Sequence, residues 1–323
     1  MVDTNMGPRP RSVEAAERLA TTARTDWAIG KLTFDQYVEN LYSLSQTVQE
    51  MKLRGDSDDW HNFAVNFARI DDEAEACKIL KRGIEQHPYS VDLLSDFLSY
   101  GLSCGEDEQC ETYYKIVVDM PLVKTTWRGF TFVIDYLLAK FEKSCSESEI
   151  DQLWQAMNER VLQFKQRFPY DERAYLSNAE VLLAFGKEDE AAEVLKDAMG
   201  KFAAPKCCLK YADMMLRRGC FEEVQRAARL GISCSAQEQA GVNLAYLVYQ
   251  LALAMDAQLH ADDAFNNKER VLEVLRHYAA AENSFDKGRS AYLENIHKRR
   301  LILEAKIDIR THMEFANDND AVD

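Results

Sequence analysis

The stretch that decides the fold runs from Glu172 to Pro205 and reads ERAYLSNAEVLLAFGKEDEAAEVLKDAMGKFAAP. Counted from Glu172, large apolar side chains stand at positions 4, 11 and 24, and alanines stand at positions 8, 20 and 27. Two helices approach closely where small side chains face each other, and larger side chains then fill the grooves beside them. Gly186 can take the left-handed conformation that ends a helix. The stretch therefore predicts two short helices joined by a turn.

A second stretch, from Ser57 to Pro88, carries the same pattern in the same phase. Its matching residues, at positions 4, 7, 8, 11, 20, 24, 27 and 32, are Trp60, Phe63, Ala64, Phe67, Ala76, Leu80, Gly83 and Pro88. At these positions both stretches resemble the tetratricopeptide repeat, a helix-turn-helix unit of about 34 residues. The resemblance implies an all-α fold, a right-handed superhelical solenoid in which each unit contacts mainly its neighbours.

Weaker copies of the unit surround these two stretches. Further helical pairs are expected over about 91–121, 127–169 and 206–234, the second of them longer than a standard unit. Because proline cannot continue a helix, four prolines mark where second helices should stop. They are Pro88, Pro121, Pro169 and Pro205. The sequence thus predicts a repeat array of about five pairs within residues 56–234.

A helical pair is expected to cap the array at its N-terminal end, over residues 12–55. Its first helix should start after Ser12, and its second should open with a capping box formed by Thr33 and Gln36. The pair lacks the repeat pattern, as is expected of a terminal unit with one face in water. Residues 1–11 are expected to be disordered.

Residues 235–315 are expected to form a helical extension at the C-terminal end. A helix over 237–257 is apolar on all sides, which predicts that other helices sandwich it. The last helix, over about 289–315, is long and charged, and the acidic tail 316–323 is expected to be disordered.

Composition limits the classes of partner. Hydrophobic residues make up 47% of the chain and charged residues 29%, with a formal net charge of −15. An acidic chain does not favour nonspecific binding to nucleic acid or to an anionic membrane, because affinity for phosphate comes from accumulated Lys and Arg. The chain has no apolar run long enough to span a membrane or to direct export, so we expect a cytoplasmic protein.

The cysteines are scattered without C-x-x-C spacing, which indicates neither a zinc site nor a disulfide framework. They are Cys77, Cys104, Cys110, Cys145, Cys207, Cys208, Cys220 and Cys234. We expect reduced, mostly buried thiols, no bound metal and no cofactor.

Catalytic motifs are missing from the sequence. It has no glycine-rich phosphate loop, nucleophile elbow or H-E-x-x-H motif, and its histidines are dispersed. The R-x(4 to 6)-H spacing of helical HEPN ribonucleases occurs at Arg82/His87, Arg54/His61 and Arg270/His277. Arg and His are common enough to produce such spacings by accident. The sequence therefore predicts no catalytic residues and no enzyme, and a HEPN-like ribonuclease ranks far below a binding protein.

The resemblance implies a ligand site on the concave surface of the array, at positions 2, 5, 6, 9, 12 and 13 of the first helices. Basic residues at these positions are Arg69, Arg128, Arg173, Lys206, Lys210 and Arg217. Family members that grip the C-terminal carboxylate of a peptide use Lys, Arg and Asn there, and Lys206 and Lys210 match in type and spacing. The asparagines are replaced by Val65, Phe132 and Ser177. A groove for an acidic or amphipathic segment is expected, in competition with plain solvated charge.

Two functions remain open. The first is a non-catalytic interaction module that binds a peptide or a partner domain in its groove. The alternative is a sensor or adaptor subunit that oligomerises or docks onto a separately encoded effector enzyme through its terminal helices. RNA binding, which some helical repeats perform, ranks third because of the acidic charge.

Overall fold

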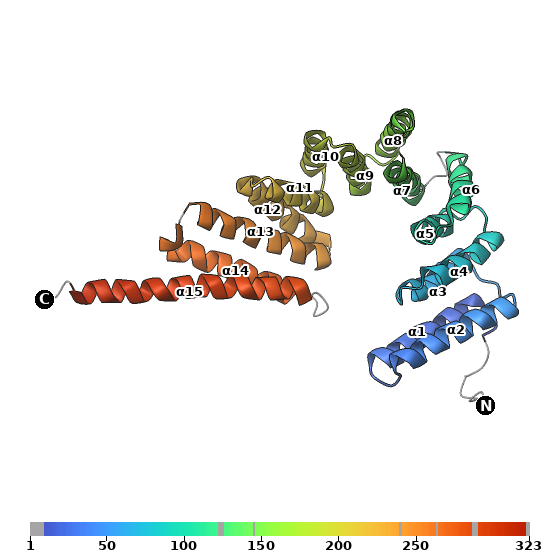
Figure 1. Cartoon of the computed structure of the whole chain (residues 1–323), viewed down its shortest axis with the longest axis horizontal. Coiled ribbons are helices and arrows are strands. Elements are labelled where there is room, and N and C mark those ends of the chain that lie inside the picture. Colours follow the sequence, from blue (N-terminus) through green and yellow to red (C-terminus); the bar gives the residue numbers. More distant parts are fainter. Residues whose placement is uncertain are drawn as a thin grey trace. The chain divides into compact units, whose positions relative to one another are not determined.

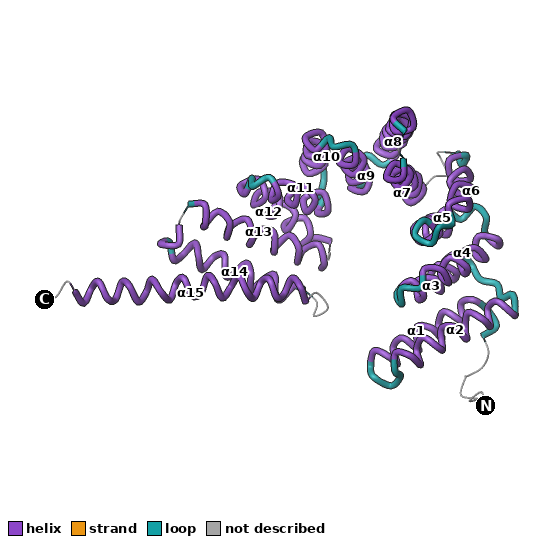
Figure 2. The backbone as a smooth tube through the Cα atoms, in the orientation of Figure 1, coloured by secondary structure: helices purple, strands orange, loops and turns teal. Residues whose placement is uncertain are grey.

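The protein is built from helices in its computed structural model, and Figure 2 traces no strand in the residues that the structure describes. These residues are 10–121, 126–144, 146–238, 241–262, 264–285 and 290–320. The predicted all-α fold is therefore confirmed. The chain divides into two compact units, Met1–Phe164 and Lys165–Asp323.

Helices of the first unit follow one another in sequential pairs, coloured blue to green in Figure 1. They are α1 (Val13–Ala28), α2 (Phe34–Glu50), α3 (Ser57–Ala68), α4 (Glu73–Gln86), α5 (Val91–Gly101), α6 (Asp107–Val118) and α7 (Trp127–Lys143), with α8 (Glu147–Arg167) extending across the unit boundary.

The N-terminal pair begins as the sequence predicts. The Ser12 side chain accepts a hydrogen bond from the backbone N–H of Ala15, so α1 starts at Val13. Thr33 and Gln36 form both hydrogen bonds of a capping box at the start of α2. These side chains satisfy N–H groups that have no partner within the helix. Residues 1–9 of the expected disordered segment lie outside the described residues.

First helices of successive pairs touch each other within the first unit. Helix α3 contacts α1 and α5, and α5 in turn contacts α7, while α4 packs between α3 and α5. Trp60 and Phe63 of α3 are fully buried in this packing. Gly83 of α4 lies against Trp60, at a point where a side chain would not fit. The small residue at position 27 of the repeat thus allows the two helices of the pair to approach closely.

The fourth pair of the first unit is long, as predicted, and is joined by aromatic packing. The buried rings of Phe130 on α7 and Phe164 on α8 stack with their centroids 5.0 Å apart. The guanidinium group of Arg160 lies over the Phe130 ring, 5.9 Å from its centroid. Pro169 follows the end of α8, where the sequence predicts that the helix stops.

The second unit continues the same order of pairs, in yellow to red in Figure 1. Its helices are α9 (Glu172–Ala184), α10 (Glu188–Lys201), α11 (Pro205–Arg217), α12 (Phe221–Glu238), α13 (Gly241–Ala261), α14 (Lys268–Ser284) and α15 (Ser290–Asp320), with a short 3₁₀ helix at Ala264–Asn266. The described residues thus contain the five predicted pairs, α3 to α12, with further helices at both ends.

Small side chains form the contact between α9 and α10. Ala179, Ala191 and Ala198 are fully buried there. Gly186 ends α9 with a φ of +70°, the left-handed conformation predicted for it. Pro205 follows the end of α10 and is also the first residue of α11, where its missing N–H would have no partner within the helix.

The C-terminal extension is fixed by contacts on several sides of α13. This helix contacts α11, α12 and α14, so the predicted sandwiched helix is confirmed, although it starts and ends slightly later than expected. Asp256 of α13 is almost fully buried and accepts a hydrogen bond of 2.9 Å from the Tyr278 hydroxyl of α14. Arg299 of α15 lies 3.4 Å from the same carboxylate oxygen. A buried charge thus links three helices.

Helix α15 reaches Asp320, beyond the end at Phe315 that the sequence predicts, and residues 321–323 of the acidic tail lie outside the described residues. The helix carries a run of three basic residues, Lys298, Arg299 and Arg300, which are paired within the unit. Lys298 contacts Glu294, and Arg300 contacts both Glu282 and Glu304. The run is therefore part of the surface that holds α15 in place.

Candidate functional site

The six predicted cations fall into two groups. Arg69 is the exposed residue that ends α3, and Arg128 lies on α7 in the first unit. Arg173 lies on α9, while Lys206, Lys210 and Arg217 lie on α11, all in the second unit. Because α9 contacts α11, the second group belongs to one surface.

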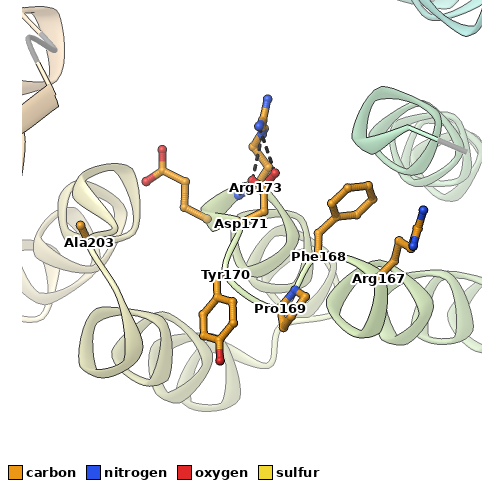
Figure 3. A pocket seen from close by; sticks show the side chains of 8 residues that line it. Arg167, Phe168, Pro169, Tyr170, Asp171, Arg173 and Ala203 are labelled. Carbon is orange, nitrogen blue, oxygen red and sulfur yellow. Dashed lines mark hydrogen bonds and ion pairs between the residues drawn. The ribbon is translucent and has the colours of Figure 1, made fainter.

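Arg173 is held by the residue that caps its own helix. The Asp171 carboxylate accepts from the backbone N–H of Arg173, from Nε at 2.9 Å and from Nη2 at 3.0 Å. Figure 3 shows the Arg173 guanidinium lying along Asp171, at the edge of a pocket that Tyr170 and Phe168 also line. Two parallel hydrogen bonds fix the direction of the guanidinium group. Arg173 is thus oriented within α9 before any partner arrives.

Lys206 is joined to α9 through Glu172. The Glu172 carboxylate accepts a 3.0 Å hydrogen bond from the backbone N–H of Lys206, and the Lys206 ammonium lies 3.7 Å from its other oxygen. An acidic side chain from the neighbouring first helix therefore caps the start of α11. This contact is favourable because the N-terminus of a helix carries partial positive charge.

Carboxylates also accompany the other two cations of the second unit. Arg217 donates a 2.6 Å hydrogen bond to Asp213, one turn earlier on α11. The surrounding protein partly removes water from the Glu180 carboxyl group of α9, and this desolvation raises its pKa although the residue as a whole is exposed. The charge of Lys210 partly opposes the shift. Lys210 therefore lies close enough to Glu180 to lower the pKa of its carboxyl group.

We call these eight residues the charged strip: Asp171, Glu172, Arg173, Glu180, Lys206, Lys210, Asp213 and Arg217. The strip contains four acidic and four basic residues, so it is mixed in sign and not positive, as the basic residues alone suggested. Glu180 and Asp213 occupy position 9 of their repeats, one of the predicted ligand positions, so reading acidic as well as basic residues at these positions would have found them. Glu172 and Asp171 precede those positions and needed the structure.

Charged pairs also connect the first helices of the first unit. His61 of α3 contacts Asp96 of α5 through its Nδ1 atom, and Arg128 of α7 lies 3.2 Å from Asp92 of α5. The hydrogen bond with Asp96 raises the pKa of His61, aided by the charges of Asp96 and Asp58, while burial and Arg128 oppose the shift. Sequence periodicity does not reveal this pairing, because its members come from three separate helices.

The His61 pair predicts a pH-dependent stability. A raised pKa means that the folded state binds the proton more tightly, so the stabilisation is complete below the unfolded pKa of about 6.5 and is lost as pH rises through the higher folded value. We expect His61→Gln to lower the urea midpoint of the first unit more at pH 6 than at pH 9. Tryptophan fluorescence measures this unit, because Trp27, Trp60, Trp127 and Trp154 all belong to it.

Asp96→Asn is the matched control for this pH dependence, since it removes the same pair from the α5 side. Both variants should flatten the pH dependence of the midpoint to a similar degree. A difference from the unaltered protein that is constant from pH 6 to pH 9 would contradict the role of His61.

The histidines singled out by sequence spacing occupy separate places. His87 contacts the Gly55 backbone carbonyl through Nε2 at 2.8 Å, beside the end of α4. Burial lowers the pKa of His277 on α14. In the part of the chain that the structure describes, no three His, Cys, Asp or Glu side chains gather in a group that could hold a metal ion.

The length and hydropathy of a helix decide whether it can cross a membrane. Within the described ranges, none of the helices combines the length and the apolar character needed to cross a bilayer.

No protein-family model and no curated protein matches this chain. Several solved structures do match this chain. TTC0263, a thermophilic TPR protein of Thermus thermophilus, aligns with a TM-score of 0.46 and 17% identity over 61% of this chain and 98% of that one. A chain of the APC/C hetero-tetramer Cut9–Hcn1 aligns with a TM-score of 0.42 and 12% identity over 88% of this chain and 52% of that one. The human IFIT1 dimer with m7Gppp-AAAA gives a TM-score of 0.42 and 13% identity over 95% of this chain and 68% of that one.

Sequential helix pairs whose first helices touch, with small residues at positions 8, 20 and 27, are what the repeat pattern predicts. The fold is a tetratricopeptide-like helical repeat. In the second unit, the repeat places the charged strip on the first helices α9 and α11.

Proposed function

We propose that this chain is a non-catalytic protein-interaction module that binds a peptide or a partner domain along the charged strip of its second unit. The observation that carries the proposal is the strip itself, an ordered row of ion pairs on two neighbouring first helices. Such a surface offers charge-assisted hydrogen bonds to an extended segment whose charges are spaced to match. The scattered cysteines favour a reducing compartment, the cytoplasm.

Lys206 and Lys210 are the cations most suited to exchange partners. The Lys206 ammonium is 3.7 Å from Glu172, beyond hydrogen-bond distance, and Lys210 influences Glu180 through its charge. Arg173 and Arg217, in contrast, hold their carboxylates at 2.9 Å and 2.6 Å. A partner carboxylate would therefore displace the weaker contacts first. This argument favours an acidic or amphipathic segment as the ligand.

The test is the double variant Lys206→Glu and Lys210→Glu, assayed against a partner isolated from the native host by affinity capture on the full chain. We expect a loss of affinity of about tenfold or more. Affinity should also depend less on salt, because fewer attractive charge pairs then remain for salt to screen. Circular dichroism should be unchanged, since exposed charges contribute little to stability. Affinities are measured by calorimetry at low and moderate salt.

Lys196→Glu with Lys201→Glu is the control, because both residues lie on α10 and carry the same charge change away from the strip. This control should keep the affinity of the unaltered protein. Equal affinity of the strip variant and the unaltered protein would place the binding site elsewhere.

The second candidate function is an adaptor or sensor subunit that oligomerises or docks through its terminal helices. It is favoured by Leu301 and Ile302 of α15, which are 52% and 49% exposed. Exposed neighbouring aliphatic side chains are common in contact surfaces between proteins. Loss of partner binding in Leu301→Glu, with binding retained in the strip variant, would favour this second function. Light scattering of the same variants would report a homo-oligomer.

A further inference from the structure

The turn between α5 and α6 lies directly on α4, the second helix of the preceding pair. The Ser103 hydroxyl donates a hydrogen bond to the Glu73 carboxylate, and the Lys81 ammonium lies 2.8 Å from the Glu106 carboxylate. Glu73 and Lys81 are eight residues apart and share one face of α4. The turn is thus fixed to this face at two points.

Cys77 stands between Glu73 and Lys81 on that face, one helical turn from each. Cys104 stands between Ser103 and Glu106 in the turn, and it lies close enough to Cys77 to help raise the pKa of the Cys77 thiol. The Cys77 side chain is buried and that of Cys104 is exposed. A solvent-accessible thiol therefore lies beside a buried one at the boundary between two helix pairs.

We propose that Cys77 and Cys104 are an oxidative modification site, which a peroxide converts into a reversible disulfide joining α4 to the α5–α6 turn. The observation behind this assignment is that the Ser103–Glu73 and Lys81–Glu106 contacts flank both cysteines and hold them at the same junction. Scattered cysteines in the sequence gave no indication of it, because the two residues belong to different helix pairs.

The reaction starts at Cys104, since this sulfur meets the solvent. Its thiolate attacks hydrogen peroxide, an S–O bond forms as the O–O bond breaks, and the released hydroxide takes a proton to become water. The Cys77 sulfur then displaces the hydroxyl from Cys104, forming the S–S bond, and the Cys77 proton leaves with that hydroxyl as a second water. Two thiols and one peroxide thus give one disulfide and two waters.

The environment of Cys77 separates the roles of the two sulfurs. Burial, helped by the neighbouring Cys104 and Glu106, raises the pKa of the Cys77 thiol to about 12. Cys77 therefore remains protonated and does not react with peroxide directly. It acts as the resolving thiol, and because attack on sulfur needs the thiolate, it gives up its proton to the departing hydroxyl as the S–S bond forms.

The bond would connect a second helix to the next pair, where the repeat otherwise relies on noncovalent contacts. A disulfide restricts the conformations that the unfolded chain can adopt between the two linked cysteines, so oxidation should stabilise the first unit. In an array whose pairs contact mainly their neighbours, this cross-link stiffens one specific junction.

The experiment uses the purified full chain, reduced and then treated with hydrogen peroxide. Peptide mapping without reductant should find the peptide of Cys77 linked to that of Cys104, and dithiothreitol should release it. Tryptophan fluorescence should show that the melting temperature of the first unit rises by about 5–10 °C on oxidation.

Cys104→Ser should abolish both the linked peptide and the rise in melting temperature, and its fold should persist because the residue is exposed. Cys220→Ser, which changes an exposed cysteine of the second unit, should preserve both. In Cys77→Ala, oxidised Cys104 has no resolving thiol and should be labelled by dimedone, a reagent for sulfenic acids. Cys104 found only in intermolecular disulfides, or a linked peptide without Cys77, would overturn the proposal.

Discussion

Replacing Gly83 by alanine is expected to lower the free energy of unfolding of the first unit by about 1–3 kcal/mol. A Cβ atom at this position would lie 2.8 Å from both Cβ and Cγ of Trp60 and 3.2 Å from a methyl group of Leu93. The Cβ of Trp60 cannot rotate away, because it is fixed to the backbone of α3. Since alanine is better than glycine within a helix by about 1 kcal/mol, a net loss would show that the clash outweighs the gain in helix propensity.

Gly200→Ala is the matched control for this prediction. Gly200 lies in α10, and a Cβ there would meet no atom within 4 Å. The same substitution should therefore stabilise the second unit, by about 0.4–1 kcal/mol. Urea denaturation followed by tryptophan fluorescence for Gly83→Ala and by circular dichroism for both variants checks the two signs. Stabilisation by both variants would mean that α3 and α4 do not meet as closely as described.

Asp256→Ala is expected to have an effect of similar size on the second unit. The buried Tyr278 hydroxyl would lose its acceptor, and an unsatisfied buried group costs about 1–3 kcal/mol. Arg299 would lose its partner at a smaller cost, because its side chain is 44% exposed and can turn to water. Helix α15 would then be held by apolar contacts and by the Arg300–Glu282 ion pair. Hydrogen exchange of residues 293–307 should rise, and the urea midpoint measured by circular dichroism should fall.

A double-mutant cycle separates the hydrogen bond from the packing around it. Tyr278→Phe alone leaves the Asp256 carboxylate buried with one donor fewer, which should also cost about 1–3 kcal/mol. Removing both groups should cost less than the sum of the single changes, by about 0.5–3 kcal/mol, because no unpaired group remains. Strict additivity of the two changes would contradict the proposed coupling. Asp256→Asn keeps an acceptor for Tyr278 and should fall between Asp256→Ala and the unaltered protein.

Local features of the fold could be predicted from the sequence because each depends on residues close together in the chain. The cap at Ser12, the capping box at Thr33 and the left-handed Gly186 each lie within a few residues of the helix end that they define. The spacing of small residues likewise sets which face of α9 meets α10. Such signals repeat with the unit, and repetition made them recognisable.

Interactions between separate helices could not be predicted in this way. Glu172 lies 34 positions before Lys206, and Asp256 lies 43 positions before Arg299, although each pair is in contact. Helical periodicity gives the face on which a charge lies but not the charge that meets it from the next helix. For this reason the basic residues of the sequence indicated a positive surface, whereas the structure has a strip of mixed charge.

Each described helix of the second unit packs chiefly on helices that come shortly before or after it in the chain, from α9 and α10 through α14 and α15. The order of synthesis on the ribosome is therefore also the order in which packing partners become available. A newly made pair finds its earlier neighbour already in place, and no segment has to wait for a distant partner to emerge. Loop closures stay short, which favours rapid folding and leaves little apolar surface exposed to the nascent chain's surroundings.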